Sequence, residues 1–211
     1  RILHNGQAKY TVPFLNNNRH SAYVLSPYDR TLLIDSDFII LNDTLNEYFS
    51  IQQNVILGER IEDIYNNKRL GFLDKFISET GVKMRWATTV LFDKSQESKT
   101  FFDLVESIYD NYNTFGSVFR FNHIQYRNDI SFSIAEHIMN GFLPSERYYL
   151  PPVLTAMDKD ILHSYENEKF IFLIDENFQE SYFLTAIDKQ NIHIMNKKSL
   201  IDQTDKFLDT L

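Results

Sequence analysis

The chain has 211 residues, of which 43% are hydrophobic and 24% are charged, and its net charge is −8 at pH 7. This composition is that of a globular protein, and an aromatic content of 15% disfavours extensive disorder. The negative charge argues against generic electrostatic binding to nucleic acid or to anionic membranes. We expect residues 1–211 to form a single domain with a sizeable core.

Cysteine is absent, so the sequence offers no disulfide, zinc-thiolate site or thiol nucleophile. No apolar run reaches the roughly 18 residues that a membrane span requires. Together these features favour a cytoplasmic protein without a membrane span.

The first half of the chain contains a short helix and two apolar strands. The helix begins in the polar stretch 16–20 and ends before Pro27. Short all-apolar runs at Thr31 to Ile34 and Asn54 to Leu57 are typical of buried strands in a largely parallel sheet. The charged stretch Glu59 to Thr80 is expected to form a loop and a short helix.

The second half alternates strands with longer helices. Ala87 to Phe92 is β-branched and apolar, which predicts a strand. Ser95 is the expected N-cap of a helix, with Ser98 as the alternative, and a second helix is expected to begin near Asp129 and to end at Gly141. Further strands are expected at Lys169 to Asp175 and Asn191 to Asn196, followed by an amphipathic C-terminal helix.

Strands that alternate with helices predict an α/β fold with a mixed, mainly parallel sheet flanked by helices. We expect Leu33, Ile34, Val90 and Phe92 to be buried in that sheet. Ligands of α/β proteins usually bind at the carboxyl ends of the strands. The first predicted strand ends at such a position, directly before Asp35-Ser36-Asp37.

The Asp35-Ser36-Asp37 motif lies between two apolar runs, and this placement has two interpretations. The first is a strand end with two solvated aspartates and Ser36 in the turn. The second is a divalent cation site, because hard cations such as Mg²⁺ and Mn²⁺ take carboxylate oxygens, often together with phosphate oxygens. The motif alone is too short to choose between them.

The segment "SPYDRTLLIDSDFIILND" resembles the D-x-D segment of GT-A fold glycosyltransferases, in particular the glycogenin and galactosyltransferase-like (family 8-like) group. Three later segments resemble that group in the same order, although Thr88-Thr89 stands where the group has Asn-x-Gly. These segments are "ATTVLFDKSQESKTFFDLV", "RNDISFSIAEH" and "IHIMNKKSL". The group's first strand is not visible before Arg1, so we expect that an N-terminal strand is missing from this sequence.

The resemblance implies a Rossmann-like GT-A domain, a metal ion and a nucleotide-sugar donor. It makes Asp35, Asp37 and His193 the metal ligands, with Mn²⁺ favoured over Mg²⁺ because imidazole suits Mn²⁺ better. Thr89 and Asp129 become the candidate catalytic residues. The residues that it implies for donor binding are Arg19, Asp35, Ser36, Asp37, Asn196 and Lys197. An ordinary strand histidine remains the alternative for His193.

The resemblance implies transfer of a hexose or pentose from a nucleotide-sugar to an acceptor hydroxyl, with retention of the anomeric configuration. The alternative is an inverting enzyme, which would need a carboxylate base placed against the acceptor hydroxyl. The acceptor is open among a glycan, a lipid-linked sugar, a protein and a modified nucleobase. A nucleotidyltransferase is disfavoured because the chain has only 6 glycines and no glycine-rich phosphate loop. A non-catalytic domain that binds sugar-nucleotides is the remaining alternative.

Overall fold

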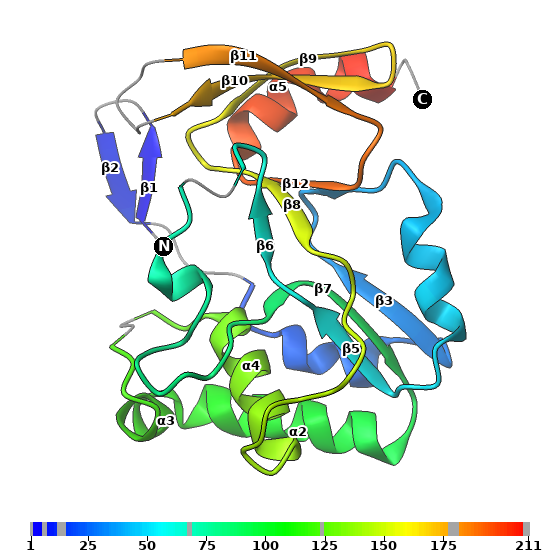
Figure 1. Cartoon of the computed structure of the whole chain (residues 1–211), viewed down its shortest axis with the longest axis vertical. Coiled ribbons are helices and arrows are strands. Elements are labelled where there is room, and N and C mark those ends of the chain that lie inside the picture. Colours follow the sequence, from blue (N-terminus) through cyan, green and yellow to red (C-terminus); the bar gives the residue numbers. More distant parts are fainter. Residues whose placement is uncertain are drawn as a thin grey trace.

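Three strands form the sheet that precedes Asp35-Ser36-Asp37, which we call the acidic motif. In the computed structural model, β3 (Arg30–Ile34), β7 (Trp86–Asp93) and β5 (Val55–Gly58) lie in the order β3-β7-β5, and β7 is antiparallel to both neighbours (Figure 1). The structure describes residues 2–5, 8–11, 16–66, 69–122, 125–176 and 182–208, with only the backbone at 2–5, 8–11, 73 and 205–208.

Two helices cover one face of this sheet. Ser95 caps α2 (Gln96–Asp110) by accepting a hydrogen bond from the Ser98 N–H at 3.2 Å, and the buried side chains of α2 recur at helical spacing. α4 (Asn128–Met139) packs against both α2 and β7, and it ends before Gly141, whose φ of 66° suits glycine. The shorter helical elements are η1 (Arg19–Ser21), α1 (Ala22–Leu25), η2 (Asp43–Ser50), η3 (Phe72–Asp74) and α3 (Tyr112–Val118).

A second sheet follows the acidic motif. It consists of β4 (Phe38–Ile39), β12 (Ile192–Ile194), β8 (Val153–Ala156) and β6 (Ile61–Asp63), in the order β4-β12-β8-β6. β8 is parallel to both β12 and β6, whereas β4 is antiparallel to β12. The acidic motif therefore connects the end of β3, in the first sheet, to the start of β4, in the second sheet.

A third sheet lies beyond β12, and α5 packs against it (Figure 1). β9 (Ile161–Glu166), β10 (Lys169–Asp175) and β11 (Tyr182–Asp188) form an antiparallel meander. Asn167 and Glu168 both have positive φ, as the tight turn between β9 and β10 requires. α5 (Lys197–Leu208) contacts β9, and β1 (Ile2–Asn5) pairs with β2 (Ala8–Thr11).

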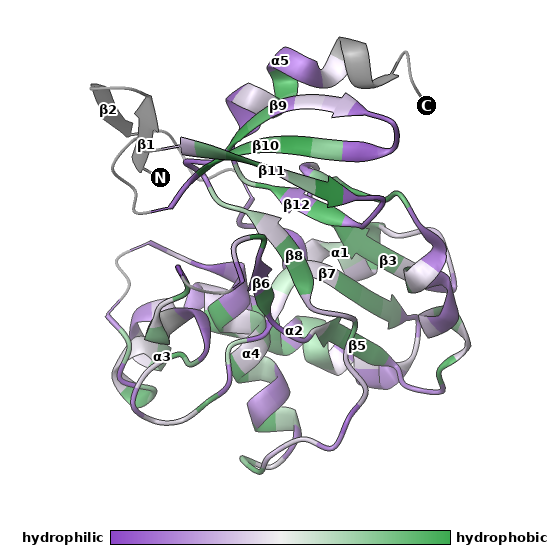
Figure 2. Ribbon diagram, turned by 45° about the horizontal axis from the view of Figure 1, so that its top comes forward, coloured by the Kyte–Doolittle hydropathy of each residue, from purple (hydrophilic) through white to green (hydrophobic). Residues whose placement is uncertain are grey.

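Two hydrophobic clusters stabilise this arrangement. The larger one joins the β3-β7-β5 sheet to α2 and α4, and the smaller one lies between the second and third sheets. The strands β5, β7, β10 and β12 are correspondingly green in Figure 2. In the described part of the chain, no helix has the length and apolar composition needed to cross a membrane.

The structure confirms an α/β fold with mixed sheets and corrects its details. Most strand pairs among the described residues are antiparallel, so the expectation of mainly parallel pairing was wrong. Val90 and Phe92 are buried as expected, whereas Leu33 and Ile34 pack against the larger hydrophobic cluster and are only partly buried. The stretch Glu59 to Thr80 contains a strand, β6, besides its short helical turn η3.

Candidate functional site

The acidic motif forms a turn that the backbone of β7 holds at one end. The Asp35 N–H donates to the Thr88 carbonyl at 3.0 Å, and the Phe38 N–H donates to the Asp35 carbonyl at 3.1 Å, which closes the turn. Ser36 is exposed at the tip, whereas only 6% of the Asp37 surface is accessible. The two aspartates therefore have different environments. Asp35 follows the last residue of β3 and is partly buried, whereas Asp37 is buried.

Strand β12 brings His193 beside Asp37. His193 pairs with Phe38 across the two strands, and the Ile194 N–H donates to the Asp37 carbonyl at 2.9 Å. One potential ligand atom from each of Asp35, Asp37 and His193 lies within 4.8 Å of the others. We call these three residues the acidic cluster. The sequence predicted this grouping, although 156 positions separate Asp37 from His193 in the chain.

Asp37 is ionised because Lys197 and His193 both contact its carboxylate. Burial alone would raise the pKa of its carboxyl, but the hydrogen bonds and charges of His193 and Lys197 outweigh burial and hold that pKa well below its usual range. Lys197 Nζ lies 2.9 Å from Oδ2, and His193 Nε2 lies 3.4 Å from Oδ1. The buried carboxylate is thus kept negative at neutral pH.

Asp35 has a separate set of partners. Its Oδ1 forms an ion pair with the Arg19 guanidinium and accepts a hydrogen bond from Asn16 Nδ2 at 3.1 Å. Its Oδ2 accepts from Thr88 Oγ1 at 2.9 Å. Arg19 also donates to the Thr88 carbonyl at 3.5 Å. Arg19 therefore acts on the cluster through Asp35, whose orientation it fixes together with Thr88.

Of the two neighbouring threonines, Thr88 contacts the cluster and the predicted Thr89 does not. Side chains alternate across a strand, so Thr88 and Thr89 point to opposite faces of β7. The Thr89 hydroxyl faces Gly58, since a Cβ atom added at Gly58 would lie 2.9 Å from it. Two adjacent threonines gave the sequence no basis for choosing between them, because the choice depends on which of them lies next to Asp35 in the fold.

Asn196 and Lys197 have different functions although they are adjacent. Asn196 holds the start of α5: its Oδ1 accepts from the Ser199 N–H at 3.1 Å, and its Nδ2 donates to the Asp160 carbonyl at 2.8 Å. Lys197 is the first residue of α5 and extends to Asp37. The structure thus brings Lys197 to the cluster and gives Asn196 the role of positioning it.

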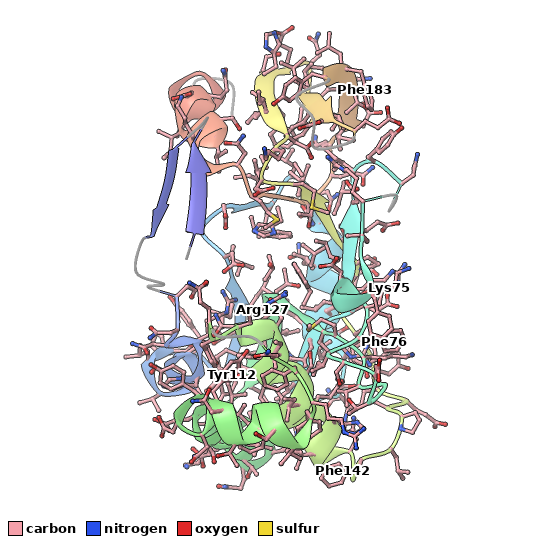
Figure 3. The ribbon with its side chains drawn as sticks, turned by 90° about the vertical axis from the view of Figure 1, so that its left-hand side faces the viewer. Lys75, Phe76, Tyr112, Arg127, Phe142 and Phe183 are labelled. Carbon is pink, nitrogen blue, oxygen red and sulfur yellow. The ribbon has the colours of Figure 1, made fainter. Side chains whose placement is uncertain are left out.

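Asp129 lies at the start of α4 and is linked to the cluster through β7. Its Oδ1 accepts a hydrogen bond from the Ala87 N–H at 2.8 Å, and its Oδ2 lies 3.2 Å from Arg127 Nη2. Arg127, labelled in Figure 3, donates its own N–H to the Tyr112 hydroxyl at 3.2 Å. Both Asp129 oxygens therefore have partners, and one partner is a backbone group next to Thr88.

We expect Asp129→Ala to lower the free energy of unfolding by about 1–3 kcal/mol, because the buried Ala87 N–H loses its acceptor. Asp129→Asn keeps an acceptor oxygen and should retain most of that stability. Denaturant titration of both variants measures the difference. Equal loss in both would show that the negative charge of Asp129, through the helix N-terminus and its pair with Arg127, stabilises the fold more than the hydrogen bond to β7 does.

The acidic cluster fits a divalent cation. Its donors are two carboxylates and an imidazole, which suit Mn²⁺ and, through the carboxylates, Mg²⁺. His193 Nδ1 is buried and has no hydrogen-bond partner among the described residues. A bound cation would replace part of the present contacts of Asp37 with Lys197 and His193. The arrangement can therefore hold one cation, with the half-exposed ammonium of Lys197 beside it and the buried Arg19 behind Asp35.

Comparison with protein-family models, with curated proteins and with solved structures finds no match to this chain.

Proposed function

We propose that this protein is a metal-dependent glycosyltransferase that moves a sugar from a nucleotide-sugar to an acceptor hydroxyl. The observation that carries the proposal is the convergence of Asp35, Asp37 and His193 from the β3–β4 turn and from β12, with Lys197 next to them. Such a set would bind the diphosphate of the donor through a Mn²⁺ or Mg²⁺ ion. The ion would supply Lewis-acid stabilisation of the departing diphosphate.

The arrangement around the cluster supports a GT-A fold as part of this proposal. The turn of the D-x-D motif follows a strand of a helix-covered sheet, and the chain then enters a second sheet that carries the histidine. The resemblance that the sequence shows to the glycogenin and galactosyltransferase-like group predicts this order of elements. It also predicts retention of the anomeric configuration.

Each side chain of the site has a distinct role in the proposal. Arg19 and Thr88 fix the Asp35 carboxylate, so that it presents a ligand atom at a constant position. Lys197, whose side chain is 49% exposed, can turn from Asp37 to a phosphate oxygen and neutralise it as a point charge. Ser36, exposed at the tip of the turn, is available to the donor.

A non-catalytic domain that binds sugar-nucleotides is the second candidate. It is favoured by the state of Asp129, both of whose oxygens already have partners, so that this carboxylate is not free to act as a base. A retaining transfer does not need a strong protein base, because an oxygen of the departing phosphate can take the acceptor proton. The transferase and the binding domain would therefore both bind the nucleotide-sugar, but only the transferase would turn it over.

A screen of nucleotide-sugars for slow donor hydrolysis separates the two candidates. The transferase predicts Mn²⁺-dependent release of a nucleoside diphosphate from at least one donor, even without an acceptor. Mn²⁺-dependent donor binding without release from any donor would favour the binding domain. Asp129→Asn and Thr89→Val, assayed with the active donor, would then test the two predicted catalytic residues.

We expect His193→Ala to lower metal-dependent hydrolysis by roughly two orders of magnitude, the scale for loss of a group that acts directly in the reaction, because one of three metal ligands is lost. His137→Ala is the matched control, since His137 lies against the rings of Phe119 and Phe142, far along the chain from the cluster. Unchanged hydrolysis in His193→Ala, with the Mn²⁺ requirement of the wild type, would remove His193 from the site.

A further inference from the structure

Both carboxylates of the acidic cluster already have a side-chain cation beside them. Arg19 pairs with Asp35, and Lys197 Nζ lies 2.9 Å from Asp37 Oδ2. The negative charge that would attract a divalent cation is thus largely neutralised inside the protein. Because Asp37 is buried, its interaction with Lys197 is screened less by water than that of an exposed pair.

The two cations differ in their freedom to move. The Arg19 side chain is 5% exposed and donates to the Thr88 carbonyl as well as to Asp35. The Lys197 side chain is 49% exposed, and Asp37 is the partner of its ammonium among the described residues. Arg19 is therefore held in place, whereas Lys197 can leave Asp37 without disturbing buried packing.

The backbone of Lys197 is fixed, although its side chain is half exposed and contacts only Asp37 among the described residues through its ammonium. Asn196 caps the first turn of α5 through the Ser199 N–H at 3.1 Å. The Ser199 hydroxyl accepts a hydrogen bond from the Leu162 N–H at 3.1 Å, which ties this turn to β9. A flexible ammonium on an anchored helix terminus can reach only positions close to Asp37.

We propose that Lys197 is the internal counter-ion of the metal-free cluster and makes cation binding depend on a diphosphate. The proposal rests on the function proposed above and concerns the order in which its ligands bind. A divalent cation that arrives alone must displace the ammonium from Asp37. When a diphosphate arrives with the cation, the ammonium moves to a phosphate oxygen and keeps an anionic partner. Cation and diphosphate therefore bind cooperatively, each strengthening the other by the same factor.

If Lys197 is an internal counter-ion, its removal should raise the affinity for Mn²⁺, whereas removal of a residue that binds a ligand directly lowers the affinity for that ligand. Removing the Lys197 charge should strengthen binding of Mn²⁺ alone, because Asp37 is then left without its ammonium. The same change should reduce the factor by which a diphosphate strengthens Mn²⁺ binding. A lysine that only contacts phosphate would leave the affinity for Mn²⁺ alone unchanged.

The test is a titration of Lys197→Met with Mn²⁺, followed by electron paramagnetic resonance of the free ion, with and without ADP, CDP, GDP or UDP. For the wild type we expect at least about 10-fold tighter Mn²⁺ binding in the presence of one of these diphosphates. Lys197→Met should bind Mn²⁺ alone about 10-fold more tightly than the wild type and gain less from the diphosphate than the wild type gains, because only the direct contact between the ion and the phosphate oxygens then couples the two ligands. Lys197→Gln serves as a second neutral variant, and thermal unfolding without ligands checks that both are folded.

Two controls isolate the charge of Lys197. Lys197→Arg keeps a cation at this position and should retain the cooperativity of the wild type. Lys198→Met removes the neighbouring ammonium, which pairs with Asp202 on the exposed side of α5, and should also behave as the wild type.

The outcomes distinguish this inference from the proposed function. If the wild type binds the two ligands cooperatively but the neutral variants bind Mn²⁺ alone no more tightly, the counter-ion role is wrong and the metal site stands. If the wild type binds no Mn²⁺ with or without any diphosphate, the metal-dependent function and the counter-ion role both fail.

Discussion

Asp37→Asn should abolish the joint stabilisation by Mn²⁺ and a nucleoside diphosphate and lower donor hydrolysis by roughly two orders of magnitude or more. The change removes a buried negative charge that contacts Lys197 and lies 3.4 Å from His193 Nε2. The amide is almost isosteric with the carboxylate, so the turn between β3 and β4 should persist. Thermal unfolding with each ligand alone and with both together measures the first effect, and release of nucleoside diphosphate measures the second.

The matched control for this prediction is Asp103→Asn, which neutralises an exposed carboxylate on α2 that pairs with Lys99. It should keep the response of the wild type to both ligands. If Asp37→Asn also keeps that response, the metal and the diphosphate bind elsewhere in the protein.

Arg69→Met should lower the free energy of unfolding by about 3–5 kcal/mol, because it removes a guanidinium that bonds to two buried carboxylates. The Arg69 side chain is 2% exposed, and its guanidinium bonds to both oxygens of Asp63 and to both oxygens of Asp160. Burial alone would lower the pKa of Arg69, but these bonds outweigh it and raise the pKa above its ordinary value. Arg69 remains charged, and denaturant titration measures the loss.

Arg60→Met is the control for Arg69, because Arg60 forms an exposed pair with Glu59 and should contribute at most about 1 kcal/mol. A loss of less than about 1 kcal/mol in Arg69→Met would contradict the view that this arginine holds β6, the β8–β9 connection and the end of β10 together.

The sequence predicted the elements whose patterns are local. The expected strand Lys169–Asp175 has the bounds of β10, and Ser95 caps α2 as expected. It did not predict the strands β9 and β11, in which exposed and buried residues follow no clear period. Nor did it predict the direction of strand pairing, which depends on the path of the chain between strands and not on the residues within them.

The sequence predicted which residues of the candidate site lie close together better than it predicted their individual contacts. The D-x-D motif identified Asp35 and Asp37, whereas His193 and Lys197 required the resemblance to a family, since no local pattern links them to the motif. The sequence analysis chose Thr89, whereas Thr88 contacts Asp35. A shift of one residue along a strand places the side chain on the opposite face of the sheet, so the sequence alone could not choose between the two. The Arg69 network joins residues 91 positions apart and has no signature in the sequence.

The most direct test of the proposed metal and donor site is anomalous diffraction from crystals of the protein grown with Mn²⁺ and a nucleoside diphosphate. The account predicts an anomalous peak about 2.1 Å from oxygens of Asp35 and Asp37 and from a nitrogen of His193, with phosphate oxygens in the same coordination shell and Lys197 Nζ on a phosphate. An ordered diphosphate without an anomalous peak at these residues, or a peak only at another group of carboxylates, would contradict it.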